Sequence, residues 1–203
     1  MTEDEGVTMT VSTSAQMRAL GRSLAALLRA GDLVILSGGL GAGKTTLTQG
    51  IGEGLGVRGP ITSPTFVIAR VHPPVRIPGQ ARAQALLEPR PALVHADAYR
   101  LGSVLELDDL DLDTDTASSV TVVEWGEGLA EGLATDRLEI IIKPAIVGAA
   151  TATDEGETDP GGLRGAAESY DADVDAPRTV LISAVGERWE GVDLPIASLP
   201  YRL

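Results

Sequence analysis

The 203-residue sequence contains no cysteine, which excludes disulfide bonds, thiolate metal sites and thiol catalysis. It also contains no asparagine and only two lysines, Lys44 and Lys143, so arginine carries nearly all of its positive charge. Aromatic residues make up 3% of the chain, and alanine, valine, leucine and isoleucine must therefore fill the core. The length and the 43% hydrophobic content predict a single domain over residues 1–203, with room for an insertion or a tail.

Positive charge is scarce, since the formal net charge is −13 at pH 7. Direct binding to nucleic acid needs clustered Lys and Arg, so we expect any part in an RNA pathway to go through a protein partner. No segment has the length of a membrane span, and residues 1–10 lack the basic and apolar regions of a signal peptide. These absences predict a soluble, cytoplasmic protein without a membrane partner.

The order of predicted elements is typical of an α/β protein. Helical spacing of apolar residues predicts a helix over 14–30, and the apolar run 33–37 predicts a buried strand. A glycine-rich loop and a second helical pattern follow. Further strands are predicted over 66–71, 92–97, 120–125, 138–143 and 178–186, with the last two pairing as a hairpin.

Two segments interrupt this order. Residues 72–91 are rich in proline and are predicted to form a surface loop inserted between strands. Residues 148–178 are rich in glycine, alanine, aspartate and threonine and are predicted to be a flexible acidic segment. The acidic run 106–115 is interpreted either as a solvated surface or as a docking surface for a basic partner.

Residues 38–45, GGLGAGKT, match the G-x-x-x-x-G-K-[ST] pattern of a phosphate-binding loop. Its glycines let successive backbone N–H groups point at phosphate oxygens, and the following helix adds the positive end of its dipole. In this motif Lys44 reaches the β- and γ-phosphates of ATP, and the Thr45 hydroxyl ligates Mg²⁺. The predicted fold is therefore a P-loop NTPase-like three-layer sandwich with a mixed, mainly parallel central sheet and a C-terminal β-hairpin.

A P-loop also needs an acid at the end of a neighbouring strand, to hold Mg²⁺ or to orient the attacking water. Two apolar runs end in a carboxylate, one at Glu124 and the other at Asp97. Both acids can border the same site if their strands flank the P-loop strand, and spacing does not assign the two roles between them. Residues 62–65, TSPT, are a candidate switch, because hydroxyls on a turn can bind a γ-phosphate or its Mg²⁺.

Three residues near these acids have open roles. His95 is interpreted as a packed strand residue rather than a metal ligand. Arg100 is interpreted either as a residue that contacts phosphate or a partner's carboxylate, or as an ordinary surface arginine. Trp125 either stacks on a ligand or fills the core.

Four separated blocks follow one another in the chain: GGLGAGKTTLTQG (38–50), TSPTF (62–66), HADAYRL (95–101) and VVEWGE (122–127). Together they resemble the TsaE family, also called YjeE, small bacterial P-loop ATPases required for threonylcarbamoyladenosine (t6A) modification of tRNA. The resemblance covers about residues 14–143. The insertion and the tail have no part in it, and Gly39 stands where many members have aspartate.

The resemblance implies roles by position. It implies that Thr45 and Glu124 are the Mg²⁺ ligands and that Asp97, which begins a second switch, is important for hydrolysis. It also implies a first switch at 62–66, with Thr62 and Thr65 at the nucleotide, and a catalytic group that includes Lys44. The implied phosphate cradle is Gly41, Ala42, Gly43, Lys44, Thr45 and Thr46.

Partners and a reaction are also implied by the resemblance. TsaE proteins work with TsaD and TsaB, and TsaD transfers the threonylcarbamoyl group to adenosine 37 of tRNAs that read codons beginning with A. The ATPase cycle acts on that pair and resets the complex between turnovers. We therefore expect Mg²⁺-dependent ATP hydrolysis that is slow for the chain alone and stimulated by the partners, with tRNA reached only through them.

Other functions can use the same loop. A small-molecule kinase is the main alternative, with Arg70, Arg76, Arg82 and Arg90 as a lid, although no acceptor-binding motif is recognisable. A GTPase would need an N-K-x-D motif to bind guanine, and the chain has no asparagine with which to build one. A nucleotide-gated binding module without useful hydrolysis stays open, because the sequence does not show turnover.

Overall fold

The computed structural model describes residues 6–75, 90–101, 103, 106, 118–145 and 176–194. Within these residues the elements follow the order β1 (Val7–Val11), α1 (Ser14–Ala25), β2 (Leu33–Gly38), α2 (Lys44–Leu55), β3 (Ala69–His72), β4 (Ala92–Asp97), β5 (Ser119–Glu124), η1 (Glu131–Leu133), β6 (Arg137–Pro144), β7 (Arg178–Val185) and η2 (Glu187–Trp189). Most of the predicted insertion, acidic run and acidic segment lies outside the described residues.

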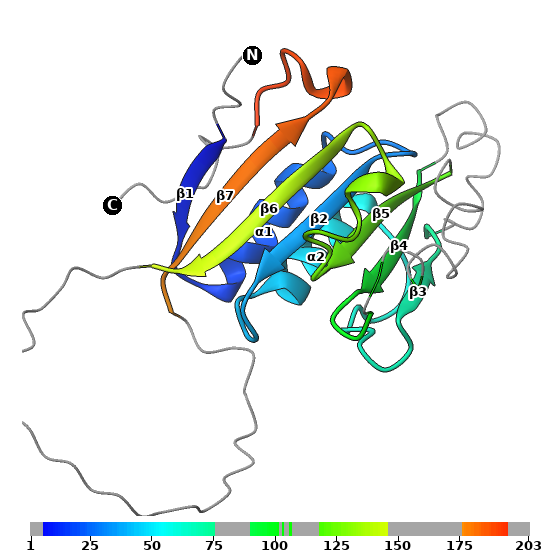
Figure 1. Ribbon diagram of the computed structural model, residues 1–203, viewed down its shortest axis with the longest axis horizontal. Helices are drawn as coiled ribbons and strands as arrows, with labels where there is room; N and C mark the ends of the chain where they lie inside the picture. Colours follow the sequence, from blue (N-terminus) through cyan, green and yellow to red (C-terminus); the bar gives the residue numbers. More distant parts are fainter. Residues whose placement is uncertain are drawn as a thin grey trace, which may run out of the picture.

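The seven described strands form one mixed sheet in the order β1-β7-β6-β2-β5-β4-β3 (Figure 1). Strands β6, β2, β5 and β4 are parallel to one another, β7 is antiparallel to β6, β1 is antiparallel to β7, and β3 is antiparallel to β4. Five strands, including β1, therefore point the same way. The predicted α/β class, the mixed and mainly parallel sheet, and the β6–β7 hairpin are confirmed.

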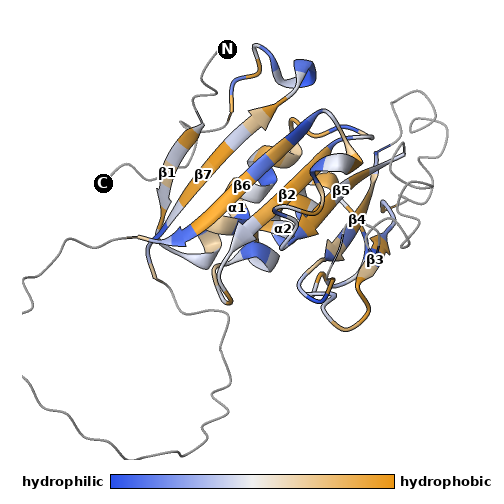
Figure 2. Cartoon of the chain, viewed as in Figure 1, coloured by the Kyte–Doolittle hydropathy of each residue, from blue (hydrophilic) through white to orange (hydrophobic). Residues whose placement is uncertain are grey.

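Strand β2 lies at the centre of the sheet and is buried on both faces. Its residues Val34 and Leu36 belong to the main apolar cluster, which contains the buried side chains of α1 and α2. The alternate residues Leu33 and Ile35 belong to a second cluster on the opposite face. Burial on both faces explains why this strand is a continuous apolar run, which Figure 2 shows in orange.

The opposite face of the sheet is covered by the segment that follows β5. Ala130 is fully buried in the second cluster, and Leu129, Leu133 and Ala134 pack against that cluster. In the described part of the chain, α1 and α2 thus form one layer, and this short segment with its 3-10 turn η1 forms the layer on the other side.

Two predicted elements are shorter in the structure, and one strand was not predicted. The strand predicted over 66–71 begins only at Ala69, because the N–H groups of Val67 and Ile68 both donate to Pro64 O in a turn. Ile68 has a φ of 68°, which a regular strand does not allow. The helix predicted over 14–30 ends at Ala25, and the edge strand β1 was not predicted.

The two α-helices pack closely against each other through glycine. A Cβ atom on Gly50 of α2 would lie 2.2 Å from the carbonyl oxygen of Arg18 in α1. A Cβ atom on Gly21 of α1 would lie 2.4 Å from Leu47 O. Because α2 carries the phosphate loop at its N-terminus, this contact helps to fix the loop against the sheet. No helix in the described part of the chain is long and apolar enough to cross a membrane.

We expect Gly50→Ala to lower the free energy of unfolding by about 2 kcal/mol, because the added methyl group must push the α1 backbone away. This loss should exceed the gain of about 1 kcal/mol that alanine brings as a better helix former. Urea denaturation measures the change. The control is Gly132→Ala, since a Cβ atom on Gly132 meets nothing within 4 Å. A Gly50→Ala variant as stable as the control would contradict this packing.

Candidate functional site

The phosphate loop joins the end of β2 to the start of α2 and depends on glycine conformations. Gly38, Gly41 and Gly43 have φ values of 145°, 72° and 107°, where residues with a side chain are strained. A Cβ atom on Gly38 would also lie 2.4 Å from Ile142 O of β6. Gly43 occupies the N-cap position of α2 and offers no side-chain cap, so the first amides of the helix can serve an anion.

Lys44 is the first residue of α2 and is only 5% exposed. Its Nζ atom donates to Gly38 O and Gly39 O, both at 2.9 Å, and lies 3.7 Å from the centre of the Trp125 ring. Burial lowers the pKa of Lys44, while the nearby carboxylates of Glu124 and Asp97 act to raise it. The ammonium group is thus held by neutral groups in a poorly solvated place, where an anionic ligand would stabilise its charge.

Glu124 ends β5, the strand beside β2, and accepts hydrogen bonds from two sides. The Thr45 hydroxyl donates to its two carboxylate oxygens at 2.8 and 3.1 Å. His95 Nε2 lies 2.8 Å from Glu124 Oε1 and must be the donor, because an ionised carboxylate only accepts. His95 is fully buried, so it holds one side of the carboxylate while Thr45 meets the other.

Asp97 ends β4 and lies opposite Glu124 in the strand register. Its Oδ2 atom accepts from the Ser63 hydroxyl at 3.0 Å and from the Thr65 hydroxyl, and its Oδ1 accepts from the Tyr99 N–H at 3.0 Å. The turn that contains the candidate first switch is therefore tied to an acid at the same sheet edge as the phosphate loop.

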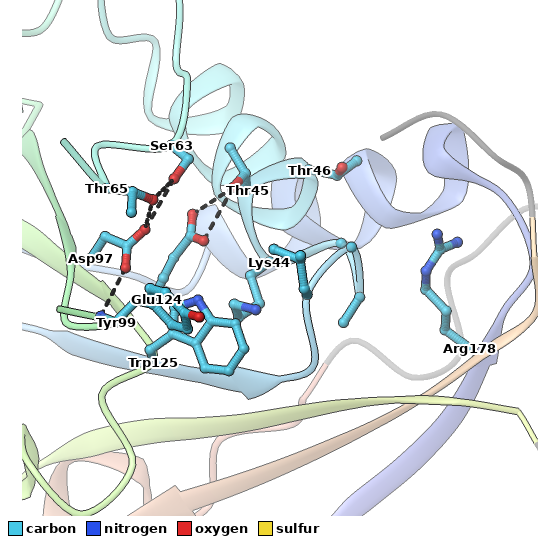
Figure 3. Close-up of a pocket in the computed structure, with 14 residues that line it drawn as sticks. Lys44, Thr45, Thr46, Ser63, Thr65, Asp97, Tyr99, Glu124, Trp125 and Arg178 are labelled. Atoms are coloured by element: carbon cyan, nitrogen blue, oxygen red, sulfur yellow. Dashed lines mark hydrogen bonds between the residues drawn. The ribbon is translucent and has the colours of Figure 1, made fainter. Parts of the chain in front are cut away.

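A pocket of about 600 Å³ connects these groups (Figure 3). This volume lies within the range of small-molecule sites, roughly 300–1,000 Å³. All the predicted site residues except Thr62 line it: Gly41, Ala42, Gly43, Lys44, Thr45, Thr46, Thr65, Asp97 and Glu124. Thr62 is exposed and does not line the pocket, whereas Ser63 does.

The oxygen atoms of Thr45 and Glu124 fit Mg²⁺. The hydroxyl and the carboxylate are both hard ligands, they face each other, and they lie directly beside the first amides of α2. Among the described residues no group of three or more His, Cys, Asp and Glu side chains could hold a metal ion. A small protein ligand set is what Mg²⁺ needs at a phosphate loop, because the ion keeps waters and takes phosphate oxygens as further ligands.

Trp125, whose role the sequence left open, lines the pocket together with Tyr99 and Arg178, which were not singled out as site residues. Tyr99 lies after β4, and its ring centre is 5.0 Å from that of Trp125. Trp125 has a φ of 60°, which turns the chain at the end of β5 and places the ring beside Lys44. Arg178 also lines the pocket, although it follows the phosphate loop by more than 130 residues. Only the pairing of β7 with β6 brings it there.

The arginines proposed as a kinase lid do not gather at this pocket as far as the structure describes them. Arg70 lies on β3 and does not line the pocket. Arg90 lies beside Gly56, at the end of α2 that is remote from Lys44: a Cβ atom on Gly56 would be 2.6 Å from Arg90 Nη1. Arg76 and Arg82 lie outside the described residues.

Comparisons with known proteins give one consistent result. The family model described as threonylcarbamoyl adenosine biosynthesis protein TsaE matches residues 11–148. A protein of Streptomyces coelicolor named tRNA threonylcarbamoyladenosine biosynthesis protein TsaE is 50% identical over 181 residues, which cover 89% of this chain and 98% of that protein. A protein of the same name from Bacillus subtilis is 37% identical over 131 residues, covering 64% of this chain and 73% of that protein. The crystal structure of Bacillus subtilis YdiB aligns with a TM-score of 0.59 at 26% identity and covers 94% of this chain and 93% of that one.

We expect Lys44→Met to lower the affinity for Mg-ATP by about 100-fold, or about 3 kcal/mol, because it removes the cation that faces the phosphates. Isothermal titration with a non-hydrolysable ATP analogue measures this loss. Lys143→Met is the matched control, since it removes the only other lysine, which is exposed on β6 and does not line the pocket. Equal affinities of the two variants would show that Lys44 does not bind the ligand.

The affinity should also depend on pH, because burial lowers the pKa of Lys44. The ammonium form binds phosphate, so affinity is expected to fall as the pH rises through that lowered pKa, before an exposed lysine would lose its charge. In Lys44→Met this alkaline fall should be absent. The same titration repeated between neutral and alkaline pH tests the sign, and an affinity that rises with pH would contradict it.

Proposed function

The chain belongs to the TsaE family of threonylcarbamoyl adenosine biosynthesis proteins, and from this we propose that it is the Mg²⁺-dependent ATPase component in the synthesis of t6A at position 37 of tRNAs that read codons beginning with A. The observation that carries this proposal is the meeting of a complete phosphate loop with two strand-end acids in one pocket. The names of the relatives support the assignment to t6A synthesis, and the residues of the pocket support the binding and hydrolysis of ATP.

The binding of ATP is proposed to use the residues that line the centre of the pocket. The amides at the start of α2 and the Lys44 ammonium bind the β- and γ-phosphates. Thr45 and Glu124 would hold Mg²⁺, which when bound offsets the charge of the phosphate oxygens. His95 keeps the Glu124 carboxylate oriented toward Thr45, because it occupies one of the carboxylate's hydrogen-bonding sites within the core.

We assign the two acids different roles. Glu124 ends the strand next to β2 and already contacts the Thr45 hydroxyl, which favours it as the Mg²⁺ ligand. Asp97 ends the next strand, about 4.8 Å further from the loop, and holds the hydroxyls of Ser63 and Thr65. This position beyond the γ-phosphate suits an acid that orients the attacking water and senses whether the phosphate is present.

The same turn offers a route from ATP to a protein partner. Thr65 bonds to Asp97 inside the pocket, while the next residue, Phe66, is 86% exposed and lies under the Arg100 guanidinium at 5.4 Å. A change at Asp97 would therefore move an exposed aromatic side chain. We propose that this surface meets TsaD and TsaB, so that hydrolysis acts on their complex. The net charge of −13 supports contact with proteins rather than with bare tRNA.

We expect Glu124→Gln to lower Mg²⁺-dependent ATP hydrolysis by about 100-fold, because glutamine keeps the size of the side chain but removes the charge at the metal site. Glu190→Gln, on the exposed segment after β7, is the control with the same chemical change. Hydrolysis is measured for the chain alone and with TsaD and TsaB. In a second measurement, the protein is depleted from cells and t6A in tRNA is quantified by mass spectrometry. Absence of stimulation together with unchanged t6A would refute the proposed function.

A further inference from the structure

Arg178 lines the pocket but has no part in the function proposed above. It is the first residue of β7 and lies opposite Pro144 of β6 and Val11 of β1 in the strand register. Strand β6 runs parallel to β2, where Gly38 pairs with Ile142. Arg178 therefore lies at the sheet edge from which the phosphate loop leaves, on the side of β2 away from the acids.

The side chain of Arg178 approaches the end of the phosphate loop. A Cβ atom on Gly43 would lie 3.7 Å from Arg178 Nε and 3.8 Å from its Cδ. Arg178 Nη1 donates to Ala176 O at 2.9 Å, which helps to hold the guanidinium in place. Figure 3 shows Arg178 on the opposite side of the loop from Glu124 and Asp97.

The pocket thus has two ends, and the proposed function gives them a direction. If the γ-phosphate lies toward Glu124 and Asp97, the remaining phosphates run along the loop and the nucleoside leaves toward β7. Of the described residues that line the pocket, Arg178 is the only one from the β6–β7 side; the others belong to the phosphate loop, to α2 or to the acid end. A planar guanidinium stacks well on the face of a purine base.

We infer that Arg178 is the residue that holds the nucleoside, with its guanidinium stacked on the base of the bound nucleotide. This inference rests on the proposed function, because it takes the direction of the nucleotide from the roles of Glu124 and Asp97. Arg178 lies beyond residues 11–148, which match the family model. Stacking does not select between purines, because both present the same kind of aromatic face.

The test compares ligands with and without a nucleoside. Binding of Mg-ATP, Mg-GTP and Mg-tripolyphosphate is measured by isothermal titration for the full chain and for Arg178→Ala. We expect the variant to lose about 10-fold in affinity for both nucleotides and to keep its affinity for tripolyphosphate within about twofold. Arg58→Ala, an exposed arginine that does not line the pocket, is the control and should bind all three ligands as the unchanged chain does.

Two results would overturn the inference. An equal loss for tripolyphosphate would make Arg178 a phosphate ligand, and no loss for any ligand would leave it without a binding role. Arg178→Lys keeps the charge without the planar group, and we expect it to show most of the loss of affinity for the two nucleotides. If Arg178→Ala does not fold, Arg178→Lys is used in its place.

The failure of the inference can be told apart from failure of the proposed function. If the unchanged chain binds ATP and Lys44→Met does not, the ATP site stands whatever Arg178→Ala shows. If the folded, unchanged chain binds neither ATP nor tripolyphosphate, the proposed function itself is wrong and the inference falls with it.

Discussion

The hydrogen bonds between the Thr45 hydroxyl and the Glu124 carboxylate join the first turn of α2 to the end of β5. The rest of the site is arranged around this junction. Thr45 is placed by the phosphate loop, and Glu124 is placed by its strand and by fully buried His95. A hydroxyl and a carboxylate fixed this way need little reorganisation to share a cation, and such preorganisation is what a metal site on rigid elements provides.

Thr45 and Glu124 meet only if α2 is packed closely against its neighbours, so the site depends on the packing of the core. Helix α2 approaches α1 through Gly50 and Gly21, and Gly38 lets the loop pass beside β6. A side chain at any of these positions would displace the helix N-terminus from the end of β5. The turn at 62–66 is held by hydrogen bonds from the hydroxyl groups of Ser63 and Thr65 to the Asp97 carboxylate and by backbone hydrogen bonds to Pro64 O. The closely packed phosphate loop therefore lies beside a turn whose hydroxyl groups bond to the Asp97 carboxylate, and such an arrangement suits a nucleotide-dependent switch.

The parts of this molecule that leave local signals could be predicted from its sequence. The phosphate loop has a fixed spacing, and the strands that end in Glu124 and Asp97 are apolar runs with a terminal acid. The turn before β3 could not be predicted, because FVIARV has the composition of a strand, while the hydrogen bonds to Pro64 O and the φ of Ile68 bend it away. The same turn decides that Ser63 rather than Thr62 faces Asp97. Arg178 reaches the pocket only through strand pairing across a long separation, which no local pattern encodes.

The central claim is that Thr45 and Glu124 act together on one Mg²⁺ ion, and a double-mutant cycle tests it most directly. Mg-ATP affinity is measured for Thr45→Val, Glu124→Gln, the double variant and the unchanged chain, each with Mg²⁺ and with the metal removed by chelation. With Mg²⁺ present, the account predicts a coupling free energy of at least about 1.5 kcal/mol, because either single change already disrupts the shared site. Independent, additive losses would contradict it, as would a coupling that is the same without the metal.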